Sequence, residues 1–345
     1  MKGEHSVQVF MAGLLALATL RPVSLVEPLD AVARVDAIKS RGYLICGVAP
    51  GVAGFAEPQG TNGFAGFDVD LCRAVAAAIL GSAEDVRFKQ ATSLEEFLAA
   101  PDIDMVSRRL TWTLERETSF DVSFGPIVFY DGQGFLARSR LKSKHAAELA
   151  GMAICVDPGT AAERRLSVYF RQRNMTFVKR LSKGIAALEQ QLESGECDAY
   201  SADISELASI LSRMRARENF ALLTDQISKE PLAPLVRNDD RRFLQIVRWT
   251  IYVLFTAEEL KVTSGNIAAM RRSEDPDIRR LLGIIPGIGS ALRLDENWAD
   301  RTIRQVGNYA QIYDRNLGPA SAIKLDRGLN RLWTDGGLLY APPLR

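Results

Sequence analysis

Short apolar strands alternate with amphipathic helices along this chain, and that order limits the possible folds more than any other feature. Residues 43–48 predict a buried strand, and residues 71–80, apolar at three- and four-residue spacing, predict a helix. Further strands are expected at residues 86–88 and 103–107, with a helix at 94–99 between them. Strand-helix-strand order implies a mainly parallel sheet with helices on its faces.

The same order begins again in the second half of the chain. A strand is expected at residues 152–156, a helix near 161–173 and another strand at 198–200, which together indicate a second α/β lobe. Two extended segments with glycine or proline, residues 126–136 and 229–236, are suited to crossing between the lobes. Two crossings return the chain to its first lobe.

The predicted fold class is therefore α/β with two lobes, each a mainly parallel sheet flanked by helices, joined by a two-segment hinge. We expect lobe 1 at residues 34–130 and lobe 2 at 137–231. Residues 237–345 are expected to return to lobe 1, with a long helix over 241–260, and to add a C-terminal extension. A minimal two-lobed protein does not need that extension.

The N-terminus resembles a signal peptide. Lys2 precedes the apolar run from Val9 to Leu20, and Ala31-Val32-Ala33 offers a small-x-small cleavage site, so residues 1–33 are predicted to be removed on export. A buried N-terminal helix or a retained anchor is the alternative. No later segment approaches the roughly 20 apolar residues that a bilayer span requires.

Four cysteines are present, and none lies in a CxxC pair that would suggest zinc or redox chemistry. They fall two in each half of the chain: Cys46 and Cys72, then Cys155 and Cys197. Of the three possible pairings, only pairing within each half forms no disulfide between the lobes, and an oxidising periplasm would permit it. Four reduced cysteines in the core remain the alternative.

Charge and motifs exclude several functional classes. The formal net charge is +1, without the clustered basic charge of a nucleic-acid-binding protein, so we expect a small ligand. The chain has two histidines, His5 and His145, and no HExxH, GxSxG or Walker motif. We therefore predict no enzymatic activity, no metal and no cofactor.

A free amino acid presents a carboxylate and an ammonium, and a protein that removes it from water must satisfy both charges. Thr111 and Thr113 share one side of an extended segment, and Arg116 follows three residues later, so the three predict a carboxylate site. The alternative for Arg116 is a solvated arginine paired with Glu115 or Glu117.

Two further positions fit the same ligand. Thr160 ends the turn from Asp157, where a helix N-terminus offers free N–H groups to an anion, although a simple strand-to-helix turn fits equally well. Asp203 follows a strand and supplies the acid that an ammonium requires. Because Asp203 and Glu206 also form an Asp-x-x-Glu capping box, a helix cap is the alternative.

Six motifs together resemble the general L-amino-acid-binding proteins of polar amino-acid ABC transporters, which are type-II solute-binding proteins of family 3. The matching segments are GFDVDLCRAVAAAILG, TWTLERETS, YDGQGF, EPLAPLVR, QVGNYAQIYDRNLGP and RGLNRLWTDGGLLYAPPLR. The resemblance runs from about Val35 to Arg345, and its tail motifs are the most specific.

The resemblance implies a periplasmic-binding-protein fold that closes on a free L-amino acid. It matches Thr111 and Thr113 to the hydroxyl pair, Arg116 to the carboxylate-binding arginine, Thr160 to the helix-start donor and Asp203 to the ammonium-binding aspartate. It also matches the arrangement of the four cysteines. An inner-membrane permease and ATPase complex would be the partners of a periplasmic monomer.

Departures from the family pattern bear on the ligand. Arg109 stands where relatives usually carry a small polar residue, and Leu110 and Ala161 stand where relatives carry threonine. Strand alternation places Arg109 beside Thr111, so we expect it and Ala161 to contact the ligand, with Arg109 as a second cation favouring acidic side chains. A diverged sensor or interaction module and a dehydratase-like enzyme are the alternative functions.

Overall fold

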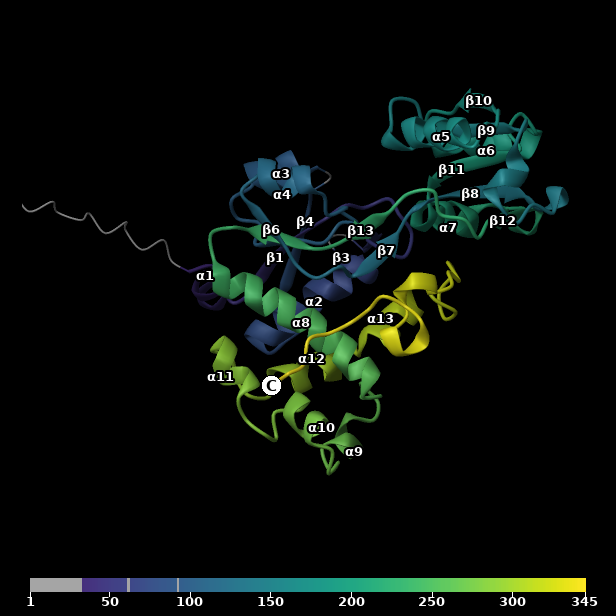
Figure 1. Ribbon diagram of the computed structural model, residues 1–345. Coiled ribbons are helices and arrows are strands. Elements are labelled where there is room, and N and C mark those ends of the chain that lie inside the picture. Colours follow the sequence, from purple (N-terminus) through teal and green to yellow (C-terminus); the bar gives the residue numbers. More distant parts are fainter. Residues whose placement is uncertain (1–32, 61–62, 92) are drawn as a thin grey trace, which may run out of the picture.

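The computed structural model describes residues 33–60, 63–91 and 93–345 and shows two α/β lobes joined by two crossing segments (Figure 1). The predicted fold class is confirmed. The predicted signal peptide, residues 1–33, lies outside the described residues except for Ala33. Among the described residues no helix is long and apolar enough to span a membrane.

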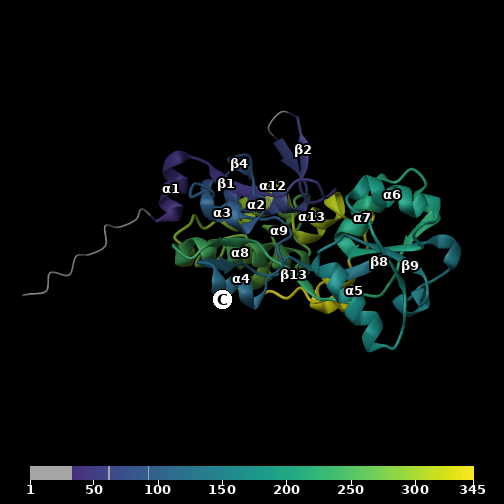
Figure 2. The ribbon, with the colours of Figure 1, turned by 90° about the horizontal axis from the view of Figure 1, so that it is seen from above.

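The first lobe is built on a five-stranded sheet of order β4-β1-β5-β14-β6. Its strands are β1 (Leu44–Val48), β4 (Val86–Gln90), β5 (Met105–Val106), β6 (Val122–Phe124) and β14 (Leu235–Arg237). β1 pairs in parallel with β4 and β5, and β14, contributed by the returning chain, pairs antiparallel with β5 and β6. A hairpin of β2 (Glu57–Gln59) and β3 (Gly63–Ala65) projects from this lobe (Figure 2).

Among the described residues, four helices flank this sheet before the crossing, and all but the last bury apolar residues. The helices before the crossing are α1 (Arg34–Arg41), α2 (Phe67–Leu80), α3 (Leu94–Ala99) and α4 (Leu114–Ser119). α2 is almost wholly buried and packs against α8 (Arg241–Glu259) of the returning chain.

The second lobe is built on a five-stranded sheet of order β10-β9-β11-β8-β12. Its strands are β8 (Gln133–Arg138), β9 (Ala153–Val156), β10 (Val178–Leu181), β11 (Ala199–Asp203) and β12 (Phe220–Leu222). Its helices are α5 (Ala161–Gln172), α6 (Ile185–Ser194) and α7 (Ile204–Arg213), with 3-10 turns at Ser139–Leu141, Ala146–Leu149 and Arg217–Asn219. β9 is parallel to β10 and β11, whereas β8 is antiparallel to β11 and β12.

Two short strands make the crossings, β7 (Phe129–Asp131) and β13 (Glu230–Leu232), and they pair antiparallel with each other (Figure 1). Their register sets Glu230 opposite Asp131. Two acidic side chains therefore meet at the junction of the lobes.

The C-terminal extension belongs to the first lobe, whose core it enlarges. Its elements are α9 (Ile267–Met270), α10 (Pro276–Leu281), α11 (Ile288–Leu292), α12 (Trp298–Val306), α13 (Tyr309–Asn316) and 3-10 turns at Gly328–Asn330 and Trp333–Asp335. α12 and α13 pack on α2 and α8, and Figure 2 shows these yellow helices among the elements of the first lobe. Trp298, Tyr309 and Tyr313 are fully buried there.

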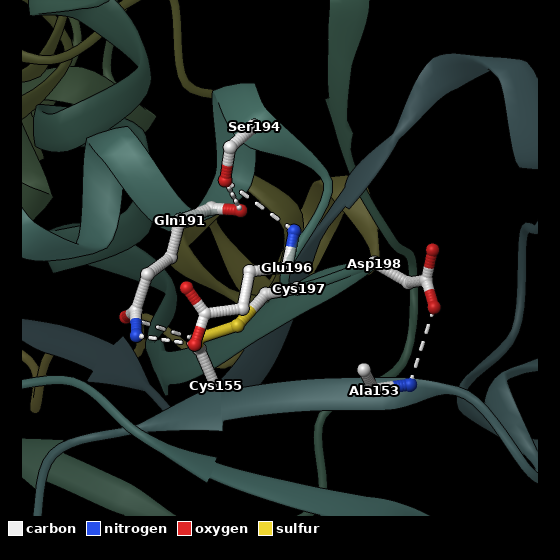
Figure 3. Close-up of a disulfide and its surroundings, with 7 residues drawn as sticks. All are labelled: Ala153, Cys155, Gln191, Ser194, Glu196, Cys197 and Asp198. Carbon is white, nitrogen blue, oxygen red and sulfur yellow. Dashed lines mark hydrogen bonds between the residues drawn. A yellow bond between two sulfur atoms is a disulfide. The ribbon is translucent and has the colours of Figure 1, made fainter.

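Both disulfides form within a lobe, as the cysteine positions predict. Cys46 pairs with Cys72, and Cys155 pairs with Cys197, so the alternative of four reduced cysteines is wrong. Figure 3 shows the second bridge joining β9 to the turn that leads into β11, beside the Asp198 carboxylate, which accepts from the Ala153 backbone N–H at 3.2 Å.

Element boundaries depart from the sequence predictions at two places that matter for the site. β5 covers only Met105–Val106, because the Asp104 carboxylate accepts from the Ile45 N–H at 2.8 Å beside it and Arg109 adopts a left-handed backbone with φ of 55°. β11 extends to Asp203 rather than ending at Tyr200, since Ala202 and Asp203 pair with Gly134 and Gln133 of β8.

The bridge in the second lobe closes a 42-residue separation, and such a constraint on the unfolded chain is worth about 4 kcal/mol by loop-closure entropy. We expect the double variant Cys155→Ser, Cys197→Ser to lose about 2 to 4 kcal/mol of unfolding free energy in urea denaturation. The matched control is the wild-type protein under reducing conditions, which loses both bridges. A double variant as stable as the oxidised wild type would contradict the expectation.

Candidate functional site

A charged cleft of about 490 Å³ lies where both lobes and β13 meet. It is lined from lobe 1 by the segment that leads into α4, and from lobe 2 by the N-terminus of α5 and the junction of β11 with α7. Its acidic residues are Glu115, Asp157, Asp203, Glu206 and Glu230, and its basic residues are Arg116, Arg164 and Arg165. Six of the seven ligand-contacting residues predicted from the sequence line it: Thr111, Thr113, Arg116, Thr160, Ala161 and Asp203.

The lobe 1 wall is fixed by hydrogen bonds within residues 111–116. Thr113 caps α4, its hydroxyl accepting from the Arg116 N–H at 3.2 Å, while Arg116 Nη1 donates to the Thr111 carbonyl at 2.7 Å. The described residues contain no ion pair of Arg116 with Glu115, and Glu117 instead accepts from the Trp112 indole at 2.8 Å. The guanidinium is therefore folded back toward the two threonines, at the cleft.

The lobe 2 wall is the N-terminus of α5. Thr160 caps this helix, since its hydroxyl accepts from the Glu163 N–H at 3.2 Å and donates to the Asp157 carbonyl at 2.8 Å. Ala161 and Ala162, the first helical residues, line the cleft. Their position puts the positive end of the helix dipole toward any anion held there.

Asp203 ends β11 and stands at the N-cap position of α7, yet its side chain makes no capping hydrogen bond. The capping-box alternative therefore does not hold for its carboxylate, which lies in the cleft lining instead. Burial and the nearby acids Asp131 and Glu230 raise its pKa to about 7 against the opposing effect of Arg109 and Arg165. Among the described residues, Arg165 pairs with Glu230 and Arg109 donates to Ser205, so neither arginine forms an ion pair with this carboxylate.

Asp131 is fully buried and lies near Asp203, whose pKa it raises. Its carboxylate accepts from the Ser205 hydroxyl and from the Gly132 N–H at 2.9 Å, and burial raises its pKa. Glu206, on the first turn of α7, also has a raised pKa, chiefly through burial. The acidic side of the cleft thus carries several carboxylates whose ionisation is unfavourable in the empty protein.

Arg109 is not among the residues that line the cleft. Its Nη1 donates to the Ser205 hydroxyl at 3.1 Å, and its guanidinium lies 5.5 Å from the centre of the Phe55 ring. The left-handed backbone at Arg109 interrupts the strand alternation that would set it beside Thr111. Arg109 instead bridges the first lobe to α7, and its contact with a ligand stays a prediction.

Three charged cleft residues were not singled out from the sequence: Arg164, Arg165 and Glu230. Arg164 and Arg165 follow Thr160 and Ala161 by four residues each, so helical spacing from the predicted donors places them on the same face of α5. Glu230 begins the crossing strand β13, where it pairs with Arg165 and accepts from the Thr111 hydroxyl at 2.8 Å. Among the described residues, no cluster of His, Cys, Asp or Glu could hold a metal ion.

Comparisons with known proteins identify the family of this chain. Residues 44–319 match the bacterial extracellular solute-binding proteins, family 3. The General L-amino acid-binding periplasmic protein AapJ of Rhizobium johnstonii is 41% identical over 89% of this chain and 92% of its own. The Glutamate/glutamine/aspartate/asparagine-binding protein BztA of Rhodobacter capsulatus is 41% identical over 90% of this chain and 93% of its own.

A solved structure has the same architecture. It is an ABC transporter / periplasmic binding protein from Brucella ovis with glutathione bound, 39% identical, with a TM-score of 0.81 over 91% of this chain and 99% of that one. The match of one family across most of the chain, together with relatives of this similarity, means that the chain belongs to the bacterial extracellular solute-binding proteins of family 3.

Proposed function

We propose that this protein captures free L-amino acids in the periplasm and delivers them to an ABC importer, releasing them unchanged. The observation that carries the proposal is one cleft that offers donors and an acid: Arg116 from lobe 1, the α5 N-terminus from lobe 2, and Asp203, which forms no ion pair with a described residue. An amino acid carries both complementary charges on one carbon.

The α-carboxylate is assigned to Arg116, Thr113 and the helix start at Thr160. A guanidinium and free N–H groups at a helix N-terminus are the donors that a carboxylate needs when it leaves water. Arg116 belongs to lobe 1 and Thr160 to lobe 2, so a carboxylate held by both favours closure of the lobes. The Thr111 hydroxyl can donate to the ligand only if its hydrogen bond to Glu230 is broken.

The α-ammonium is assigned to Asp203. Burial and neighbouring acids disfavour its ionised form in the empty protein, and an incoming ammonium supplies the missing positive charge. Binding therefore relieves an electrostatic cost that the empty cleft carries.

The remaining parts of the proposal concern the cellular setting. Export by residues 1–33 agrees with two disulfides, which persist in an oxidising compartment. The closed monomer would be recognised by an inner-membrane permease and ATPase complex, as the relatives' description as ABC transporter proteins suggests.

Glutathione is a second candidate ligand, because the Brucella ovis relative was solved with it bound. Its γ-glutamyl end carries the same α-ammonium and α-carboxylate as a free amino acid. The proposed contacts of Arg116 and Asp203 would serve either molecule, so glutathione belongs in every titration beside the amino acids.

The cleft assignment predicts that Arg116→Ala and Asp203→Asn each weaken amino-acid binding about 100-fold, because each leaves one buried ligand charge without its partner. Isothermal titration calorimetry with each standard amino acid measures this. Arg171→Ala, an exposed arginine on α5 outside the cleft, is the matched control and should bind as the wild type does. Wild-type protein that binds none of them would overturn the transport proposal in favour of a sensor.

Binding should weaken as the pH falls. The pKa of Asp203 is raised to about 7 in the empty protein, so below that pH most molecules must lose a proton before they accept an ammonium. Affinity is expected to fall about tenfold from pH 8 to pH 6, with about half a proton released per ligand at pH 7 and close to one at pH 6. Calorimetry in buffers of different ionisation enthalpy measures that release. Asp203→Asn should show neither effect.

The free energy of unfolding of the empty protein should decrease as the pH rises, whereas the affinity for the ligand should increase. The folded pKa of Asp203 exceeds the unfolded value of about 3.9, so its contribution to stability is full below that value and is lost as the pH rises through 7. Asp203→Asn, which mimics the protonated acid, should be about 1 to 1.5 kcal/mol more stable than the wild type at pH 5 and about 3 to 4 kcal/mol more stable at pH 8. Urea denaturation at both pH values tests this. A difference independent of pH would contradict it.

A further inference from the structure

Two consecutive arginines of α5, Arg164 and Arg165, line the cleft but have different surroundings. Arg164 Nη1 donates to the Gly159 carbonyl at 3.2 Å, an exposed contact. Arg165 Nη1 forms an ion pair with Glu230 across the junction of the lobes. The Arg165 side chain is 43% exposed, whereas the Glu230 side chain is only 6% exposed.

Glu230 is held by donors from three directions. Its Oε1 accepts from Arg165 and from the Ser228 hydroxyl at 3.1 Å, and its Oε2 accepts from the Thr111 hydroxyl at 2.8 Å. A buried carboxylate with both oxygens occupied has a fixed orientation, so it fixes the guanidinium beside it. Glu230 therefore acts as a positioning residue for Arg165.

Arg165 keeps donors for a ligand. Its contacts with the described residues use Nη1, which leaves other N–H groups of a five-donor fork on a side chain that is nearly half exposed at the cleft. Arg116, by contrast, already contacts the Thr111 carbonyl and is assigned to the α-carboxylate. The cleft thus offers a second oriented cation.

The position of Arg165 along α5 fits the side chain of an amino acid. Four residues separate it from Ala161 at the helix start, which is about 6 Å along the helix axis. A ligand with its carboxylate at the α5 N-terminus and its ammonium at Asp203 would direct its side chain along this wall. A three- or four-atom side chain ending in oxygen would span that interval.

We propose that Arg165, oriented by Glu230, selects the ligand's side chain and favours amino acids whose side chains end in a carbonyl or carboxylate oxygen: Asp, Asn, Glu and Gln. The inference rests on the proposed function, because it places the α-carboxylate and the ammonium as described there. A guanidinium donates to an amide oxygen as well as, more strongly, to a carboxylate, and it repels the cationic side chains of Lys and Arg.

Arg165→Met tests the proposal, with Arg171→Met, on the same helix but outside the cleft, as the matched control. Calorimetric titration should show that Arg165→Met weakens Asp, Asn, Glu and Gln binding about 10- to 50-fold, while Ala binding changes less than about threefold. Arg171→Met should change every affinity less than about threefold, since its charge is solvated. Far-UV circular dichroism checks that each variant is folded, and Arg165→Gln substitutes if Arg165→Met is not.

The role of Glu230 has its own test. Glu230→Gln keeps an oxygen acceptor for Arg165 and should retain most of the preference for Gln over Ala, whereas Glu230→Met should lose it about as far as Arg165→Met does. A purely structural role would lower thermal stability in both variants without changing the ratio of the two affinities. An unchanged ratio in Glu230→Met would therefore overturn the positioning role.

The outcomes distinguish a failure of this inference from a failure of the proposed function. Equal losses for Ala and Gln in Arg165→Met would mean that Arg165 holds the α-carboxylate, which overturns side-chain selection and leaves amino-acid binding intact. Selective loss for the four oxygen-ended ligands supports selection. Wild-type protein that binds no amino acid overturns the proposed function and, with it, this inference.

Discussion

The structure depends on carboxylates gathered where the two crossing strands meet the second lobe. Asp131 and Glu230 stand opposite each other in the β7–β13 pair, and Asp203 lies beside them at the end of β11. Like charges placed directly across a strand pair destabilise it unless each is satisfied. Ser205 and Gly132 satisfy Asp131, and Arg165, Ser228 and Thr111 satisfy Glu230, so Asp203 is the acid left to a ligand.

That arrangement links stability to function through one side chain. A protein built only for stability would not bury an acid that makes no capping hydrogen bond and whose neighbours are acids. Retaining it makes sense when an ammonium arrives to complete the cluster, because the electrostatic cost in the empty state then becomes part of the binding energy. Under the proposed function, Arg116 and the N-terminus of α5, which line the same cleft, complete the recognition of a zwitterion.

Sequence periodicity predicted both lobes and both disulfides because each depends on local patterns and on the position of residues along the chain. The threonines, Arg116, Thr160 and Asp203 could be proposed from short motifs for the same reason. Glu230 and Arg165 could not, since their pairing joins residues 65 positions apart across the junction of the lobes. Arg109 shows the limit of strand alternation: one residue with φ of 55° redirects the side chain toward α7.

The crossings also indicate where the lobes would bend. The Asn330 side chain, from the C-terminal extension, makes two hydrogen bonds to the backbone of Tyr130 on β7. It accepts from the Tyr130 N–H at 2.6 Å and donates to the Tyr130 carbonyl at 3.2 Å. The next residues belong to the second lobe, because Asp131 accepts from Ser205 and the Gly132 carbonyl accepts from Ile204 at 2.9 Å. The first lobe thus holds Tyr130 and the second lobe holds Asp131.

The other crossing is divided in the same way. Pro231 accepts from the Trp112 N–H of lobe 1 at 2.8 Å, whereas Ser228 accepts from the Gln133 N–H of lobe 2 at 3.0 Å. Closure as proposed would therefore change backbone angles between residues 130 and 131 and between 228 and 231, beside Glu230 and the cleft. Since Asn330 of the extension holds Tyr130 on the lobe 1 side of the first crossing, closure would bend the chain beside the cleft.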